Sequence, residues 1–260
     1  MKLWTLVENT TLHEDLTPEH GLSLYIEAAG KRILFDMGAS GAFRKNAEKM
    51  GVDLSGVDIA ILSHGHADHG GGLLCFLTHN QKAPVYINQN AFSPCYNGEE
   101  KFIGLDASLA ANSRIHYTQG SHTLSDGLYL YNCGMDADPY PLDTAGLTVF
   151  RDGALQPEDF RHEQYLLIEE NGRRILISGC SHRGILNIMH RFRPDVLIGG
   201  FHYMKKAPNS VELAENARLL AAYPTVYYTC HCTGMEQFHA MKPILGDNLH
   251  YLHTGSIIQL

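Results

Sequence analysis

SHGHADHGGG, residues 63–72, is the stretch of the chain that decides its fold. It follows the apolar run DIAIL (58–62), which has the composition of a buried strand, and it leads into a Leu- and Phe-rich segment that predicts a helix over 70–79. The stretch is therefore expected on a loop at the edge of a sheet. Four of the six residues from 64 to 69 are His or Asp, so this loop is the first candidate for a functional site.

The spacing within this loop has a physical logic. His64 and His66 are two residues apart, so in extended backbone their side chains point the same way. Asp68 and His69 follow where the chain turns into the helix, so they can reach a second point nearby. Imidazole and carboxylate groups together suit zinc, iron or manganese, and the three glycines at 70–72 let the backbone pass close to such a site. The loop therefore predicts a metal site.

Strands and helices are expected to alternate on both sides of this loop. Runs 22–27 and 32–35 read as a strand pair, and 165–169 and 174–178 flank Asn171-Gly172, which is a strong hairpin signal. A helix is predicted over 210–222 with Ser210 as its N-cap. This order predicts a layered α/β protein with two sheets and outer helices. One domain over residues 1–260 is expected, in which the weakly patterned stretch of about 92–155 could be an insertion or a lid.

The composition excludes several classes of protein. The 260 residues are 44% hydrophobic and carry a formal net charge of −8, which argues against a disordered chain and against a nucleic-acid binder. No apolar run is long enough for a membrane span, and the first residues do not read as a signal peptide. The six cysteines show no C-x-x-C pairing, so we expect reduced thiols and a cytoplasmic protein.

The motif H-x-H-x-D-H after a strand resembles the signature of the metallo-β-lactamase superfamily. The resemblance covers nearly the whole chain and implies a four-layer αβ/βα sandwich of two mixed sheets with outer helices, with one or two metals between the sheets. Four more specific segments, one of which contains this motif, resemble the branch named for 7,8-dihydropterin-6-methyl-4-(β-D-ribofuranosyl)aminobenzene-5′-phosphate synthase. They are SHGHADHGGGL (63–73), FRHEQYLLIEENGRRILISGCSHRGILNI (160–188), IGGFH (198–202) and CHCTG (230–234).

The resemblance also implies a ligand set. His64 and His66 match ligands of a first metal, whereas Asp68, His69 and His231 match ligands of a second. The sequence departs from the superfamily pattern at the remaining positions, because it lacks the usual histidine motif and has Gly-Cys-Ser-His (179–182) where an aspartate would bridge the metals. His162 or His182 could complete the first site, and Cys180, His182 or solvent alone could form the bridge. We favour His182 as the ligand because it lies on a strand-end loop.

Several neighbouring residues have predicted supporting roles. His202, at another strand end, is the candidate general acid, and Arg183 is a candidate anchor for a substrate phosphate, with Lys205 and Lys206 nearby. Asp36 and Glu163 could each hold a ligand histidine. Cys230 and Cys232 alternate with His231 on an expected strand, so both are predicted to face away from the site and pack in the interior.

These residues predict a metal-dependent hydrolase or related transferase. Two divalent ions, most simply zinc but with iron or manganese as alternatives, would share a hydroxide that attacks a small ester or phosphoester, in the narrower hypothesis a phosphorylated, pterin-related molecule. Asp68 would both bind metal and orient that hydroxide. Two alternatives remain open: an iron-dependent oxidoreductase on the same ligands, and a non-catalytic, metal-stabilised binding module. The intact His/Asp cluster weakens the second alternative.

Overall fold

Two seven-stranded sheets form the centre of the molecule in a computed structural model that describes residues 1–132 and 138–260. Across the first sheet the strands are β18 (Ile257–Gln259), β1 (Lys2–Val7), β2 (Ser23–Ala28), β3 (Lys31–Phe35), β4 (Ile59–Ile61), β5 (Val85–Asn88) and β8 (Ile115–Thr118). Across the second they are β17 (Leu249–Tyr251), β16 (Val226–Thr229), β15 (Val196–Ile198), β14 (Arg173–Ile177), β13 (Gln164–Glu170), β10 (Leu128–Asn132) and β9 (Ser121–Ser125).

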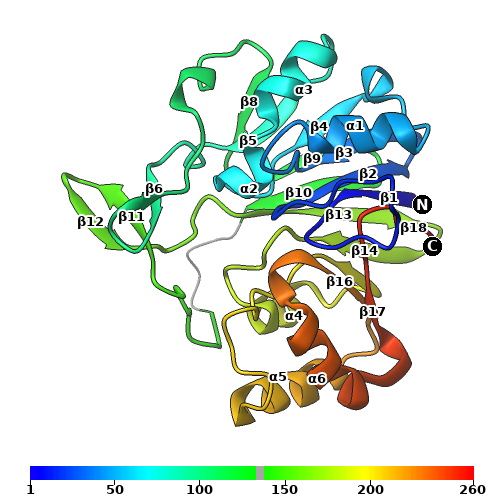
Figure 1. Cartoon of the computed structure of the whole chain (residues 1–260), viewed down its shortest axis with the longest axis vertical. Helices are drawn as coiled ribbons and strands as arrows, with labels where there is room; N and C mark the ends of the chain where they lie inside the picture. Colours follow the sequence, from blue (N-terminus) through cyan, green and yellow to red (C-terminus); the bar gives the residue numbers. More distant parts are fainter. Residues whose placement is uncertain (133–137) are drawn as a thin grey trace.

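The sheets face each other because both offer an apolar side. Leu24 and Ile26 of the first sheet share one buried cluster with Leu166 and Ile168 of the second. Helices cover the outer faces, with α1 (Ala42–Lys49) and α3 (Leu73–His79) on the first sheet and α4 (Ile185–Phe192), α5 (Val211–Ala221) and α6 (Met235–Leu245) on the second. Figure 1 shows the four resulting layers, and the predicted fold class is confirmed.

The carboxyl ends of the parallel strands bring the functional loops together. Strands β3, β4, β5 and β8 run parallel in the first sheet, and β14, β15, β16 and β17 do so in the second. The loop after β4 holds residues 63–72 and continues into the short helix α2 (Ala67–Gly70). Ligand-bearing loops of open α/β sheets gather at this edge.

The weakly patterned middle of the chain divides between three sheets. Strands β8, β9 and β10 join the two main sheets, whereas β12 (Ala154–Pro157), β11 (Leu147–Arg151), β6 (Cys95–Asn97) and β7 (Lys101–Phe102) form a small sheet of their own. Figure 1 shows this small sheet projecting from one side of the sandwich. A lid role for the stretch of about 92–155 stays a prediction, and part of it, residues 133–137, lies outside the described residues.

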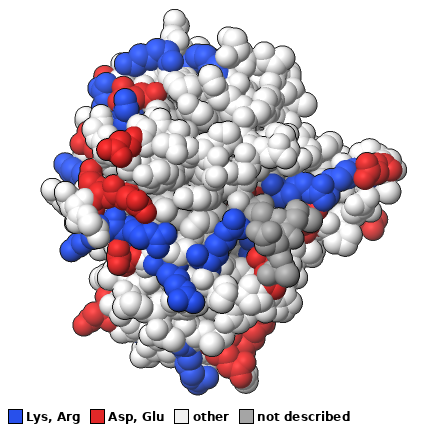
Figure 2. Space-filling view, turned by 180° about the vertical axis from the view of Figure 1, so that it is seen from behind, with Lys and Arg blue, Asp and Glu red and all other residues white. Residues whose placement is uncertain are grey.

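Polar side chains cap the start of helix α5 and cover much of the outer surface. Ser210 caps α5 as predicted, because its hydroxyl accepts a hydrogen bond from the Leu213 N–H at 3.2 Å. Figure 2 shows one face, on which Lys and Arg side chains lie among Asp and Glu side chains. Within residues 1–132 and 138–260, we find no helix with the length and apolar character that a membrane crossing requires.

Candidate metal centre

A cavity of about 420 Å³ opens where the strand-end loops of the two sheets meet. Its polar lining comes from loops of both halves and from the small sheet, and consists of His20, His66, Asp68, Asn97, Lys101, Cys180, His182, His202, Lys205, His231 and Cys232. Its apolar lining includes Phe102, Ile103, Leu147 and Met204. A concave site with a few convergent polar groups is the usual form of a small-molecule site.

The backbone is strained at the strand ends that build this site. Asp36, Ser181, His202 and His231 all have positive φ values, between 50° and 59°. Each follows closely after the end of a strand, β3, β14, β15 or β16 respectively. Left-handed conformations of such residues cost about 1–3 kcal/mol each and persist where the surrounding structure enforces them, commonly at functional sites.

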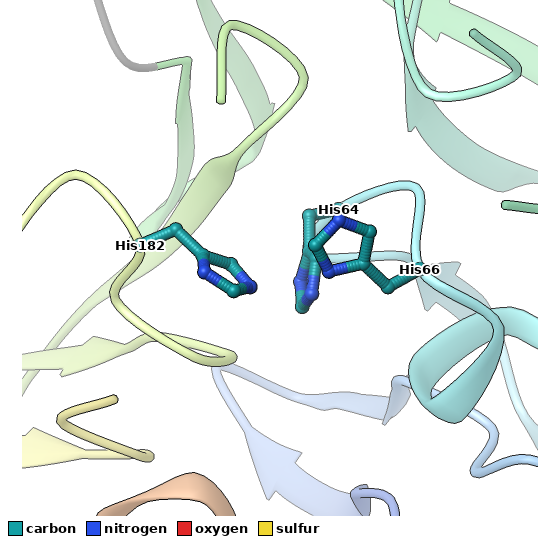
Figure 3. Close-up of side chains that lie close together, drawn as sticks. All are labelled: His64, His66 and His182. Atoms are coloured by element: carbon teal, nitrogen blue, oxygen red, sulfur yellow. The ribbon is translucent and has the colours of Figure 1, made fainter. Parts of the chain in front are cut away.

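Three imidazoles form the first cluster. The His64 and His66 side chains point from the loop after β4 toward the His182 side chain from the loop after β14 (Figure 3), and ring nitrogens of all three lie within 4.8 Å of one another. Among the described residues, Nε2 of His64, Nε2 of His66 and both ring nitrogens of His182 are buried without a hydrogen-bond partner. Buried polar atoms are normally paired, so this cluster fits a bound cation.

Electrostatics keeps these three rings neutral. Burial, reinforced by the neighbouring imidazoles, lowers the pKa of His64 and of His182 well below the usual value. Burial also lowers the pKa of His66, to about 3. Neutral imidazole is the form that binds metal ions, so the cluster offers lone pairs at every pH near neutrality.

Asp68, His69 and His231 form the second cluster. Nε2 of His69 lies 3.2 Å from Nε2 of His231, and Oδ2 of Asp68 lies 3.3 Å from the same His231 atom. Burial alone would lower the pKa of His69, but the charges of Asp36 and Asp68 outweigh it and raise that pKa to about 9. One carboxylate and two imidazole nitrogens converge beside the first cluster, and their role as ligands of a second metal stays a prediction.

Hydrogen bonds to Nδ1 fix the ring orientation of His64, His69 and His231. Nδ1 of His69 lies 2.6 Å from Asp36, Nδ1 of His231 lies 2.7 Å from Asn9 Oδ1, and Nδ1 of His64 lies 2.8 Å from Ser63 Oγ. In each case Nε2 is left to face the cluster, which is the arrangement that fixes metal-binding tautomers. Asp36 therefore holds His69, as predicted. Glu163 instead accepts the backbone N–H groups of His182 and Arg183, at 2.7 and 3.0 Å.

The ring nitrogens of His162 have polar partners that those of His182 lack among the described residues. Its Nδ1 accepts the backbone N–H of Gly65 at 2.9 Å, so its ring proton must sit on Nε2, which faces Glu158 Oε1 at 3.7 Å. His162 also lies with His66 and Cys95 in a compact group, and burial lowers its pKa to about 4. It is thus tied to the backbone of the histidine loop, whereas the His182 nitrogens are unpaired among the described residues.

Two cysteines enter the site, and one of them was not expected there. Cys180 lies at the cavity with its Sγ 3.1 Å from Nε2 of His69. The prediction that Cys230 and Cys232 both face away is wrong for Cys232, which lines the cavity and groups with Cys180 and His231. The reason is that β16 ends at Thr229 and residues 231–233 form a 3₁₀ turn, so strand alternation no longer applies. Cys230 is buried between the sheets as predicted.

The predicted substrate-binding groups are only partly at the cavity. His202 lines it, with its ring centroid 4.2 Å from that of His182 and its Nδ1 unpaired among the described residues. The guanidinium of Arg183 lies outside the cavity lining and pairs with Asp138 and with the Asp159 carbonyl. Lys205 lines the cavity, but Lys206 pairs with Asp143 and Glu212.

Sequence reasoning missed four residues at this site. His20 reaches Asp68 Oδ2 at 3.4 Å across the cavity mouth, and Asn9 orients His231. Lys101 and Phe102 line the cavity from the small sheet. No motif marks any of them, because each belongs to a segment that only the tertiary fold brings to the strand ends.

Fold and ligand geometry together define a metallo-β-lactamase-type protein, and the chain belongs to the metallo-β-lactamase superfamily, whose family model matches residues 16–203. Members of this superfamily bind metal ions. A crystal structure described as Tm1679, a metal-dependent hydrolase of the β-lactamase superfamily, is similar over 100% of this chain and 99% of its own, with a TM-score of 0.86 and 26% identity. The structure of Zn²⁺-bound PqqB from Methylobacterium extorquens, 13% identical with a TM-score of 0.58 over 100% of both chains, shares the fold alone.

Two proteins of Methanocaldococcus jannaschii are similar in sequence, each at 25% identity. One is named 7,8-dihydropterin-6-methyl-4-(beta-D-ribofuranosyl)-aminobenzene-5′-phosphate synthase, and the match covers 100% of this chain and 96% of that protein. The other is an uncharacterized protein, MJ0448, matched over 97% of this chain and 98% of its own length. The predicted resemblance to the superfamily and to this branch is therefore confirmed.

Proposed function

We propose that this protein is a hydrolase or related transferase that uses two divalent metal ions, most simply zinc, on a small ester or phosphoester. The observation that carries the proposal is the convergence of unpaired ring nitrogens of His64, His66 and His182 beside one cavity, which His66 and His182 line. His64, His66 and His182 would hold one metal, and Asp68, His69 and His231 the other.

The metals, when bound, would act as Lewis acids and lower the pKa of water. The chain's own residues have distinct tasks around them. The Asp68 carboxylate, with Oδ2 3.3 Å from His231 Nε2, is placed to bind metal and to orient the attacking water through a hydrogen bond. His202, beside His182 at the cavity wall, is placed to return a proton to the leaving group.

The cavity favours a substrate with an apolar body and an anionic group. Phe102, Ile103 and Leu147 offer an apolar wall, and Lys101 and Lys205 supply positive charge from opposite elements, β7 and the loop after β15. A phosphorylated, ring-containing molecule fits this description, and the name of the synthase relative favours the same class. These two lysines replace Arg183 as our preferred phosphate contacts, because Arg183 pairs with Asp138 away from the cavity.

Elemental analysis tests the proposal. Protein purified without added metal or chelator should carry about two zinc or manganese ions per chain. The His66→Ala variant should lose metal, and a matched His116→Ala variant, altered at an exposed histidine outside the site, should not. About one or two iron ions per chain would instead favour an iron-dependent oxidoreductase on the same ligands. No bound metal, even after reconstitution, would overturn the catalytic interpretation.

A further inference from the structure

We infer that the Cys180 thiolate is a metal ligand shared by the two clusters, in the position where the superfamily pattern has a bridging aspartate. This inference rests on the proposed two-metal function and names one more ligand for it. Cys180 recurs in three compact ligand groups. They are Cys180 with His64 and His69, Cys180 with His182 and His202, and Cys180 with His231 and Cys232, each with its ligand atoms within 4.8 Å.

The position of Cys180 is that of a bridge. His64 and His182 belong to the first cluster, and His69 and His231 belong to the second, so the Cys180 sulfur lies near members of both. Its distance to Nε2 of His69 is 3.1 Å, and its side chain is only 2% exposed. A single donor atom within reach of both clusters is what a shared ligand requires.

Packing does not account for this cysteine. Cys230, fifty residues later, belongs to the apolar cluster between the sheets, whereas Cys180 belongs to none of the three apolar clusters formed by the described residues. Its neighbours are imidazole nitrogens and a second thiol. A buried cysteine that serves only to fill space would be expected among aliphatic side chains.

The local backbone is arranged to bring Cys180 to this point. A Cβ on Gly179 would collide with the Ser63 side chain, so the absence of one lets the β14 loop approach the histidine loop closely. Gly200 leaves similar room for Cys232. Ser181, directly after Cys180, has a φ of 58°, which turns the chain so that residues 180 and 182 both line the cavity.

The available carboxylates are engaged elsewhere, which leaves the bridge to sulfur. Asp36 is directed at Nδ1 of His69 and at the Ser63 hydroxyl, on the far side of the ring. Asp68 lies beside His231 in the second cluster. On metal binding the Cys180 S–H bond breaks, its proton passes to solvent, and sulfur–metal bonds form without any change in oxidation state. A soft thiolate favours zinc, cobalt or iron over manganese and magnesium.

Cobalt(II) spectroscopy tests the inference on the full chain. The wild-type protein loaded with Co²⁺ should show sulfur-to-cobalt charge-transfer absorption in the near ultraviolet. The Cys180→Ser and Cys180→Asp variants should lose that absorption, and Cys180→Asp should still bind two cobalt ions. The matched Cys232→Ser variant, which removes the neighbouring thiol of the same cavity, should keep it.

The possible outcomes distinguish failure of the proposed role of Cys180 from failure of the two-metal site. Two bound cobalt ions without charge-transfer absorption, or absorption lost only in Cys232→Ser, would overturn the role of Cys180 and leave the proposed function standing. No bound cobalt in the wild-type protein would instead overturn the two-metal site itself. Should the Cys180 variants not fold, X-ray absorption of the zinc-loaded wild type decides, because Zn–S bonds of about 2.3 Å are distinguishable from Zn–N bonds of about 2.0–2.1 Å.

Discussion

The hydrogen bonds of the ring nitrogens distinguish His162 from His182, the two candidates for the third ligand of the first metal. His162 and His182 both lie near His66, with ring centroids 5.2 and 4.8 Å away. The difference is that Nδ1 of His162 accepts the Gly65 N–H, so binding a metal at its Nε2 would require the fully deprotonated ring. Sequence spacing carries no information about tautomers, and that is why this part of the ligand set stayed open until the hydrogen bonds were known.

This distinction predicts opposite outcomes for two substitutions. His182→Asn should halve the metal content, because the first cluster loses a ligand. His162→Leu should leave the metal content unchanged but lower the free energy of unfolding by about 1–3 kcal/mol, because the buried Gly65 N–H loses its acceptor. Elemental analysis and urea titration of both variants make the comparison, with His116→Ala as the control. Metal loss in His162→Leu alone would reverse the assignment.

The element that carries the histidines depends on close backbone contacts. The loop from β4 through α2 packs against residues 37–40, where the Met37 N–H donates to the His69 carbonyl at 2.7 Å. Gly71 and Gly72 make this approach possible, because a Cβ on Gly71 would collide with the carbonyl oxygens of Ala39 and Ala67, and a Cβ on Gly72 with that of Met37. Backbone atoms cannot rotate away as a side chain can, so this contact resists substitution.

Gly71→Ala should therefore destabilise the protein by about 1–3 kcal/mol and displace α2 with its ligands Asp68 and His69. The matched control is Gly41→Ala, whose new Cβ would meet only the Cys75 Sγ at an ordinary 3.5 Å. Thermal unfolding and metal content of the two variants give the comparison. Equal stability of both variants would contradict the packing argument.

The small sheet marks the limit of sequence reasoning at the level of elements. Most strands of the two main sheets can be predicted from apolar runs, because at least one of their faces is buried, although the edge strands β9 and β18 contain no buried residue. Strands β7 and β12 are largely exposed and as short as two residues, so they leave no apolar pattern. The sequence therefore does not predict the small sheet, which supplies Lys101 and Phe102 to the cavity.

At the scale of the whole molecule, one topological pattern occurs twice. An antiparallel pair, β2–β3 or β13–β14, leads in each half into parallel strands, β4–β5 or β15–β16. Packing the two halves face to face places both sets of carboxyl ends at one edge, and there the first half supplies His64, His66, Asp68 and His69 while the second supplies His182 and His231. The amino-acid sequences of the two halves show no evident repeat, because the shared pattern lies in strand topology and not in residue identity.

Clustering so many buried histidines at this junction makes the stability of the chelated protein depend on pH. The pKa values of His64, His66, His162 and His182 are lowered in the folded state by burial, so the unfolded chain binds more protons below the ordinary pKa of about 6.5. Each such histidine contributes stability that is present above that value and is lost as the pH falls. The pKa of His69 is raised to about 9, so its contribution is complete below about 6.5 and is lost as the pH rises toward 9.

The free energy of unfolding after chelation should therefore peak near neutral pH and fall on both sides. As the pH falls from about 6 to 5, the slope that each of the four histidines adds rises from about 1.0 toward at most about 1.4 kcal/mol per pH unit. Urea titrations of chelated protein across this range measure the slope, and His66→Asn should reduce it by one such increment, whereas the exposed His116→Ala should not. A free energy of unfolding that does not change from pH 7 to pH 5 would mean that these rings are not held neutral, and would remove the electrostatic basis of the first cluster.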